Sequence, residues 1–347
     1  MQRARVTFEP TQALWRVRLQ LLWRGLKSTW AMFAESKIGL TGLGIIIFFI
    51  LLWMLWPIYP WLMERLAWTP EELEAARNAP YGAISSIYQV YDPVTGYDPL
   101  IPLEENREGN ILPPSRRHPL GTDQYGRDIL AQLMASTGSE FTLGVLAALI
   151  TVFIGTCIGA ITAYYGGFVD TFFMRLADVF ILFPLVSFLI VLGSMMELTL
   201  LKLALILGIL FGFGQITIIL KSQALAIKVK PYIEAAKVAG GGHFHVIFRH
   251  IIPNMLPLSF LYMMFNVTSA IFSEAALSFF GLLPGARTTW GIMIDSAHSG
   301  GYILGGRSFE YWWLWVPPGV AITLLCSAFY LVGRGLDEVV NPRLRKR

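Results

Sequence analysis

The sequence is poor in charge and in cysteine. Only 14% of its 347 residues are Asp, Glu, Lys or Arg, against about 25% in a soluble domain, so charges are too few to coat a water-facing surface of this size. Its two cysteines, Cys157 and Cys326, both lie in apolar runs, which argues against a disulfide framework or a zinc site. No small-residue cleavage site follows the first apolar run, so a cleaved signal peptide is not expected.

Motifs for catalysis are also missing from the sequence. It contains no Gly-x-x-x-x-Gly-Lys-Ser/Thr loop, so we expect that this polypeptide does not itself bind ATP. Neither Gly-x-Ser-x-Gly nor His-Glu-x-x-His occurs, and no paired-cysteine site is present. An enzymatic role for this chain alone is therefore not expected.

Hydrophobic residues make up 55% of the chain, and they gather in six charge-free runs long enough to cross a bilayer. The runs cover residues 38–63, 141–169, 179–196, 203–220, 251–273 and 311–333. The third contains Pro184, which we expect a bundled membrane helix to accommodate. A further apolar stretch, 275–283, is too short to cross and is predicted to be re-entrant or interfacial. The sequence thus predicts an all-α integral membrane protein with six transmembrane helices.

Basic residues are distributed unevenly between the connecting segments. Residues 1–37, 170–178, 221–250 and 334–347 together hold 18 of the 27 Lys and Arg residues, which places both termini in the cytoplasm by the positive-inside rule. The loop 64–140 carries twelve acidic residues and six basic ones, as expected of a translocated segment.

These patterns divide the chain into five parts. Residues 1–37 form a cytoplasmic N-terminal segment, 38–63 the first transmembrane helix and 64–140 an extracytoplasmic insertion. Residues 141–333 form a core of five transmembrane helices, and 334–347 form a cytoplasmic tail. Within the first part, apolar residues at helical spacing predict an amphipathic surface helix over 11–33.

Local patterns also predict two packing features. Gly155, Gly159 and Ala163 recur every four residues in the second run, a spacing that lets two membrane helices approach closely. Just before that run, Thr122 or Asp123 is the expected N-cap of the helix that enters the membrane.

The loop between the fourth and fifth runs predicts two short helices joined by glycines. Pro231 suits a first helical position, and Glu234 complements the helix dipole from the first turn. The glycines at 240–242 then end this helix. A second helix with one apolar face is expected where apolar residues recur at helical spacing, at Phe244, Ile247, Phe248 and Ile251. Such a loop is either a connector covered by the chain's own helices or a docking element for a cytoplasmic partner.

This loop resembles the coupling loop of ABC importer permeases. The resemblance rests on Glu234-Ala235-Ala236, on Gly240 after three intervening residues, and on Ile252-Pro253 after eleven more. Segments 118–128, 164–170, 274–282 and 341–344 are similar, in order and spacing, to the dipeptide, oligopeptide and nickel branch of that family. Glu140 is a departure, because a small polar residue is common there in the family.

The resemblance implies a fold and a function. The fold would be the type I ABC importer permease (MetI-like) bundle, with the insertion between helices 1 and 2. The chain would translocate peptides by alternating access across the cytoplasmic membrane of a bacterium or archaeon. It would act with a homologous permease as a heterodimer, with two cytoplasmic ATP-binding subunits that carry ATP and Mg, and with an extracytoplasmic solute-binding protein. The residues implied in ATPase coupling are Glu234, Ala235, Ala236, Gly240, Ile252 and Pro253. No cofactor in this chain and no nucleic-acid partner is implied.

Alternatives remain open at this point. Nickel or another small solute is an alternative cargo, and a membrane scaffold is an alternative role. A transporter driven by an ion gradient would require intramembrane carboxylates and inverted repeats. Glu274 either lines a path or gate or reaches the membrane interface at a helix end. His243 and His245 are not expected to bind metal, because no cysteine or acidic cluster joins them.

Overall fold

The computed structural model describes residues 27, 30–78, 110–282, 288–304 and 308–340. Helices dominate this part of the chain, and its only β feature is an isolated bridge between Thr122 and Asp128. The all-α prediction is therefore confirmed. Most of the predicted amphipathic helix, its residues 11–26, lies outside the described residues. So do residues 79–109 of the predicted insertion and residues 341–347 of the predicted tail.

Five continuous helical stretches are long and apolar enough to cross a membrane: Lys37–Leu66, Ile129–Tyr165, Leu200–Lys228, His243–Phe279 and Trp312–Val340. The first stretch comprises α2 (Lys37–Leu55), η1 (Trp56–Ile58) and α3 (Tyr59–Leu66), and the second is α5 (Ile129–Tyr165). The third comprises α8 (Leu200–Phe211), η3 (Gly212–Ile216) and α9 (Thr217–Lys228), and the fourth comprises α11 (His243–Val246), η4 (Ile247–Ile251) and α12 (Ile252–Phe279). The fifth comprises η5 (Trp312–Leu314) and α14 (Val316–Val340). A sixth span is completed by α6 (Gly167–Leu182) and α7 (Leu185–Met195), counted as one broken crossing. The six predicted runs fall on these six spans.

The broken span corrects one expectation about Pro184. Instead of being accommodated within a continuous helix, this proline separates α6 from α7, whose axes differ by 79°. Phe183 is extended, with a ψ angle of 125°, because a residue that precedes proline is disfavoured in the helical region. The third run therefore contains a sharp bend at Phe183 and Pro184.

The helices extend beyond the charge-free runs that predicted them. α5 has 37 residues, or about 55 Å at 1.5 Å per residue, and a hydrocarbon core is about 30 Å thick. Its N-cap is Asp128, which accepts a hydrogen bond from the Ala131 amide at 2.8 Å, so the expectation of Thr122 or Asp123 as the cap is wrong. Those two side chains instead stabilise the preceding loop, where Thr122 bonds the backbone of residues 110 and 112.

The apolar stretch after Glu274 is not a separate re-entrant segment. α12 continues through it to Phe279, which corrects that expectation. Glu274 lies within this continuous helix, and its side chain is buried in the protein. The short helix α13 (Trp290–Ser299) follows and packs against the end of α12.

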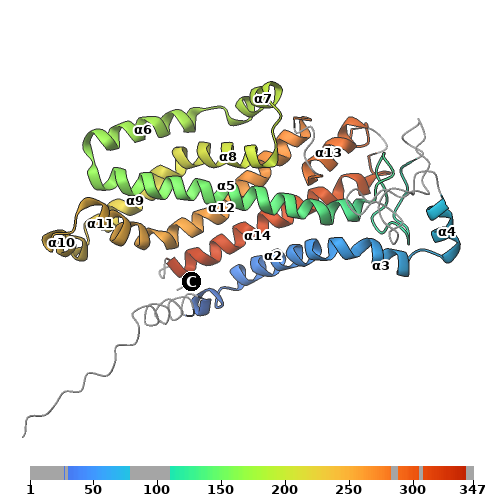
Figure 1. Cartoon of the computed structure of the whole chain (residues 1–347), viewed down its shortest axis with the longest axis horizontal. Coiled ribbons are helices and arrows are strands. Elements are labelled where there is room, and N and C mark those ends of the chain that lie inside the picture. The colour runs from blue at the N-terminus through green and yellow to red at the C-terminus, as the bar shows by residue number, and fades with distance from the viewer. Residues whose placement is uncertain (1–26, 28–29, 79–109, 283–287, 305–307, 341–347) are drawn as a thin grey trace, which may run out of the picture.

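The second span lies at the centre of the bundle, between α12 on one side and α8 and α9 on the other (Figure 1). A Cβ atom at Gly155 would lie 2.7 Å from the Ile216 side chain, and one at Gly159 would lie 2.8 Å from the Lys221 amide. The predicted close helix packing at these positions is therefore confirmed, with Ala163 buried one turn further on.

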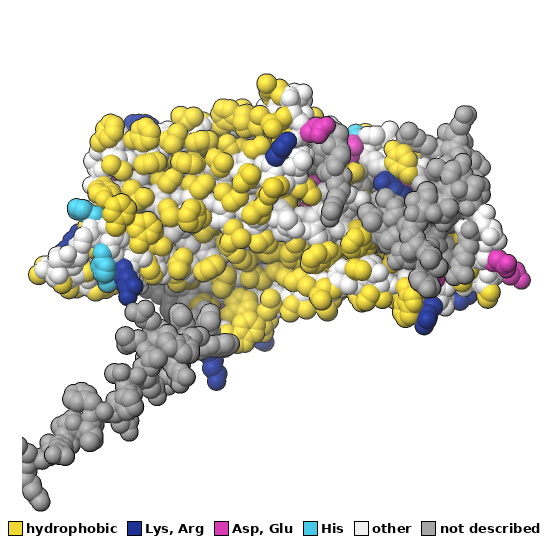
Figure 2. Space-filling model, viewed as in Figure 1, with side chains coloured by type: hydrophobic (Ala, Val, Ile, Leu, Met, Phe, Trp, Pro, Cys, Tyr) yellow, Lys and Arg dark blue, Asp and Glu magenta, His cyan; other side chains and the backbone are white. Residues whose placement is uncertain are grey.

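Two ends of the bundle can be distinguished along its long axis. The short helices α10 (Pro231–Val238) and α11 lie at one end, together with the start of α2 and the end of α14 (Figure 1). α3, α13 and α4 (Pro70–Asn78) lie toward the opposite end. Hydrophobic side chains cover the middle of the face shown in Figure 2, and charged side chains are concentrated toward the ends, as expected of a membrane-spanning bundle.

Candidate coupling elbow

The first arm of the predicted loop is a short helix, α10, with defined ends. Lys230 precedes it in an extended conformation, Pro231 occupies the first turn, and Glu234 is the acidic residue of that turn. At the other end, the Gly240 amide donates to the Lys237 carbonyl and the Gly241 amide donates to the Ala236 carbonyl. This pair of bonds is the Schellman motif, which ends a helix with a residue in the left-handed conformation.

The three glycines of the turn have different requirements. Gly240 has a φ angle of +86°, and a Cβ atom at Gly241 would lie 2.6 Å from the Ala236 carbonyl oxygen. A Cβ atom at Gly242 would meet no atom within 4 Å. The helix–glycine–helix prediction is confirmed, and the structure assigns the conformational need for glycine to the first two positions.

The second arm runs from His243 through α11 and η4 into the fifth span. η4 is a π-helical turn, and it divides the apolar residues that the sequence placed on one face. Ile247 and Ile251 are buried in the bundle, whereas Phe244 and Phe248 are exposed and stack on each other at 6.2 Å. The prediction of a single apolar face is therefore wrong, because the wider π-helical turn changes which side chains lie on the same side of the helix.

The elbow, defined here as residues 231–251, is anchored to the membrane spans by one apolar cluster. Ile233 of α10 is fully buried in it, together with residues of both arms and of the second, fourth and fifth spans. The buried members are Ala160, Ala163, Ile216, Leu220, Ala224, Ile227, Ile233, Val246, Ile247, Ile251 and Met255. Ile233 of α10 therefore belongs to the same buried cluster as side chains of α9 and α12.

The outer side of the elbow presents apolar side chains to the surface. Val238 and Phe244 are exposed by 89% and 75%, and both lie outside the charge-free runs 203–220 and 251–273. Between the arms lies an open groove of about 630 Å³, lined by Tyr232, Ala236, Ala239, Gly240, Gly241, Gly242, His245 and His250. Exposed apolar surface of this kind marks an interaction site.

The structure separates the six residues implied in coupling into two groups. Ala236 and Gly240 line the groove, and Glu234 and Ala235 are exposed on the same short helix. Ile252 and Pro253 lie at the start of α12 and do not line the groove. The first group thus lies on the short helix α10 and its glycine turn, and the second lies at the start of the long helix α12.

Two contacts that the sequence did not predict connect the elbow to the second span. Tyr164 lies in the last turn of α5, and its hydroxyl is 3.0 Å from Nδ1 of His243. The Lys237 ammonium lies 5.2 Å from the centre of the Tyr164 ring. Tyr164 therefore contacts both arms at once. No sequence spacing signals this contact, because 79 residues separate Tyr164 from His243.

The same end of α5 is tied to the fourth span. Lys228 donates hydrogen bonds to the carbonyl oxygens of Ala163 and Tyr164, at 2.8 and 2.9 Å. Lys221 forms an ion pair with Asp170 at the start of α6. Cations near a helix C-terminus bond its free carbonyl groups and complement the helix dipole.

The histidines of the elbow contact aromatic rings of their neighbours. His243 meets Tyr164, and the rings of His245 and His250 lie 5.3 Å apart. Among the described residues, no group of three or more His, Cys, Asp or Glu side chains is arranged to hold a metal ion.

Glu274 lies far from the elbow, and its side chain is fully buried within this chain. It accepts a hydrogen bond from Ser278 at 2.6 Å and interacts electrostatically with Glu140 of α5. Glu140 in turn accepts a hydrogen bond from the Trp290 amide at 3.1 Å. We name the end of the bundle that contains Glu140, Glu274, Ser278, Thr289 and Trp290 the distal end. A gate role for Glu274 stays a prediction.

Six apolar spans with a surface-exposed elbow between the fourth and fifth define an integral membrane protein of the permease class. The sequence profile of the family described as "Binding-protein-dependent transport system inner membrane component" matches residues 155–346. The chain belongs to this family of ABC transporter permeases.

Two relatives are similar over most of the chain. The dipeptide transport system permease protein DppC of Bacillus subtilis (strain 168) is 33% identical over 236 residues, which cover 68% of this chain and 72% of the relative. DppC of Haemophilus influenzae is 31% identical over 257 residues, covering 72% and 84%. The family match does not favour the alternative of a transporter driven by an ion gradient.

Proposed function

We propose that this chain is one of two permease subunits of an ATP-driven importer for peptides. The names of the DppC relatives support the choice of peptide as cargo. The family description supports two further kinds of partner, a solute-binding protein and ATPase subunits. A homologous permease would complete the translocation path as a heterodimer, and ATP and Mg would bind on the two ATPase subunits.

The single observation that carries this proposal is the geometry of the elbow. It combines an exposed apolar outer side, a groove between its arms and a buried apolar base that contacts spans four and five. A connector covered by the chain's own helices would not leave Val238 and Phe244 exposed. The positions of the basic residues support a cytoplasmic elbow and two cytoplasmic termini.

Coupling then follows from packing. Closure of the ATPase dimer would push on α10, which is hinged at the Gly240 turn and seated on the fourth and fifth spans by Ile233. Movement of those spans favours the outward-facing or the inward-facing arrangement of the two permease bundles. ATP thus shifts the population between two states that exist in both its presence and its absence.

Co-purification from membranes tests the docking role. Wild-type protein is expected to retain ATP-binding subunits and a second permease, whereas Glu234→Arg and Gly240→Asp are expected to lose the ATPases and keep the permease. Glu197→Arg is the matched control, because Glu197 is an exposed acid between α7 and α8, far from the elbow. If wild-type protein purifies alone and the elbow substitutions change nothing, the importer assignment is wrong.

Transport measurements test the cargo. The assembled complex in proteoliposomes, supplied with its binding protein and ATP, is expected to accumulate labelled dipeptides or oligopeptides and to leave labelled Ni²⁺ outside. Accumulation of nickel without peptide would overturn the peptide assignment and retain the ABC permease.

A further inference from the structure

Two interruptions of membrane helices lie beside each other on the side of the bundle formed by the third and fourth spans. One is the break between α6 and α7 at Phe183 and Pro184. The other is η3, a π-helical turn in which Gly214 has non-helical angles, with φ −81° and ψ −126°. The rings of Phe180 and Phe213, one from each interrupted span, stack at 5.6 Å. π turns within helices occur frequently at functional sites, and interrupted helices at membrane depth are tolerated where they line a cavity.

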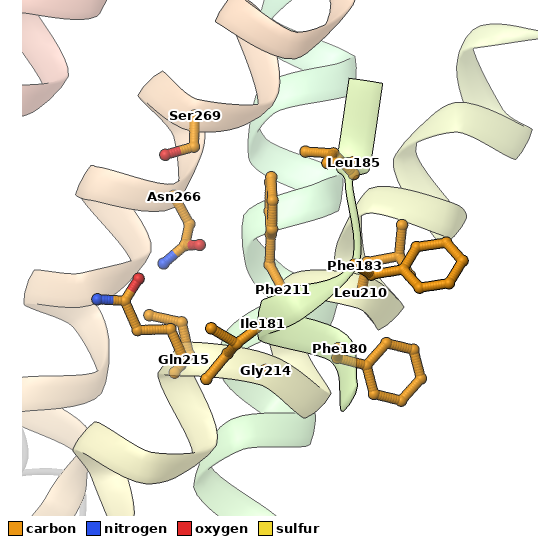
Figure 3. A pocket seen from close by; sticks show the side chains of 11 residues that line it. Phe180, Ile181, Phe183, Leu185, Leu210, Phe211, Gly214, Gln215, Asn266 and Ser269 are labelled. Carbon is orange, nitrogen blue, oxygen red and sulfur yellow. The ribbon is translucent and has the colours of Figure 1, made fainter. Parts of the chain in front are cut away.

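A pocket of about 240 Å³ lies between these interruptions and α12. Its lining residues are Phe180, Ile181, Phe183, Leu185, Leu210, Phe211, Gly214, Gln215, Ile216, Asn266 and Ser269. Figure 3 shows Asn266 and Ser269 projecting from α12, with the Gln215 carboxamide turned toward them, while the rings of Phe180 and Phe183 lie on the far side. The pocket therefore has one polar wall and one apolar wall.

The polar wall is unusual for its position in the molecule. Gln215 lies within the charge-free run of the fourth span, is exposed on this chain, and has no hydrogen-bond partner among the described residues. Asn266 uses one amide hydrogen on the Tyr262 carbonyl at 2.8 Å, so its carbonyl oxygen remains available. A carboxamide that faces lipid without a partner loses several kcal/mol. These groups are therefore expected to face water or a polar ligand.

The chemistry of the wall selects a class of ligand. A carboxamide both donates and accepts hydrogen bonds, as a peptide main-chain amide does. None of the lining residues is charged or contains imidazole or thiol, so the pocket offers nothing that distinguishes acidic from basic cargo. Its aromatic and aliphatic wall can receive side chains of varied shape.

We propose that this pocket binds the peptide in transit, with Gln215 and Asn266 forming hydrogen bonds to main-chain amide groups of the cargo. The inference rests on the proposed function and adds a specific contact site to it. Recognition through the main chain explains how one path carries peptides of different sequence. The neighbouring helix interruptions allow the pocket to change shape as the spans move.

Uptake by the assembled complex in proteoliposomes tests this proposal with two cargoes. One is a labelled tripeptide, and the other is the same tripeptide with its main-chain nitrogens methylated, which removes the donors. Gln215→Leu and Asn266→Leu are each expected to reduce kcat/KM for the unmodified tripeptide by about threefold to tenfold, the loss of one hydrogen bond. For the methylated tripeptide, the variants should differ from wild type by less than about twofold.

Gln223→Leu is the matched control, because Gln223 lies eight residues further along the same span and does not line the pocket. Equal loss for both tripeptides, or unchanged uptake of the unmodified one, would overturn the proposal. So would loss of the second permease during purification of the variants, which would make the pocket a contact between subunits. Failure of the wild-type complex to take up either tripeptide would instead refute the proposed function itself.

Discussion

At the end of the bundle opposite the elbow, buried polar side chains bind helices to one another, whereas at the elbow apolar side chains and glycines reach the surface. Trp290, Glu140 and Glu274 are all buried and connect α5, α12 and α13. Nearby, His118 and Asp128 form a fully buried pair at 2.8 Å. The Trp290 amide and indole both donate hydrogen bonds to α5, and directional bonds between buried groups specify one arrangement, so the distal end is expected to be the more rigid.

The elbow differs from that end in the kind of contact that holds it. Its anchoring cluster is apolar, and apolar packing is non-directional, so side chains within that cluster can shift against one another without breaking hydrogen bonds. Its turn depends on the backbone conformation of Gly240 and Gly241. From this comparison we expect a permease that moves at the elbow while its opposite end keeps its helices together. The following substitutions test that comparison.

The largest effect is expected for Trp290→Ala. The Trp290 indole is fully buried, donates a hydrogen bond to the Leu133 carbonyl at 3.1 Å and packs on Phe49 of α2. Its loss should reduce the free energy of unfolding by about 3–5 kcal/mol, measured by thermal unfolding of the purified protein in detergent. Trp312→Ala is the control, because Trp312 is 42% exposed. Equal effects of the two changes would contradict a rigid distal end.

Asp128→Ala is expected to have the next largest effect. The change removes the N-cap of α5 and the carboxylate bonded to His118, which together contribute about 2–3 kcal/mol. Asp128→Asn retains an oxygen that can cap the helix and should retain more than half of that stability. Thermal unfolding under the same conditions measures both, and an alanine variant as stable as the asparagine variant would exclude the capping role.

Gly240→Ala is expected to act locally on the elbow. A side chain at a φ angle of +86° strains the turn by about 1 kcal/mol, which should speed hydrogen exchange in 236–242 by about fivefold. Gly242→Ala should leave exchange unchanged, because its Cβ would meet open space. Exchange spreading to α5 in the Gly240 variant would show that the elbow is less independent than its apolar anchoring indicates.

Tyr164→Phe is expected to have the smallest effect. It removes the hydroxyl that contacts His243 and keeps the ring that faces Lys237, a change of less than about 1 kcal/mol. In the reconstituted complex the ATP hydrolysed per peptide imported should rise by about twofold. Tyr164→Leu removes both contacts and should raise that ratio further. A ratio that both variants leave unchanged would assign Tyr164 a purely structural role.

Some features could be predicted from the sequence because they depend on neighbouring residues. The charge-free runs predicted all six spans, since the free energy of placing a helix in hydrocarbon sums over its own residues. The glycine turn was predicted because helix termination depends on the conformation that Gly240 alone can adopt without strain. The wrong N-cap of α5 shows the limit, because several acceptors lay within a few residues and tertiary contacts selected Asp128.

The amino-acid sequence alone thus determined the membrane class, the number of spans and the position of the elbow. Only the tertiary structure decided that Glu140 meets Glu274, that Tyr164 contacts both arms of the elbow, and that two helix interruptions enclose a pocket with Gln215. Hydropathy and turn preference are properties of short segments. Contacts between helices depend on their crossing and rotation, which the packing of the whole bundle sets.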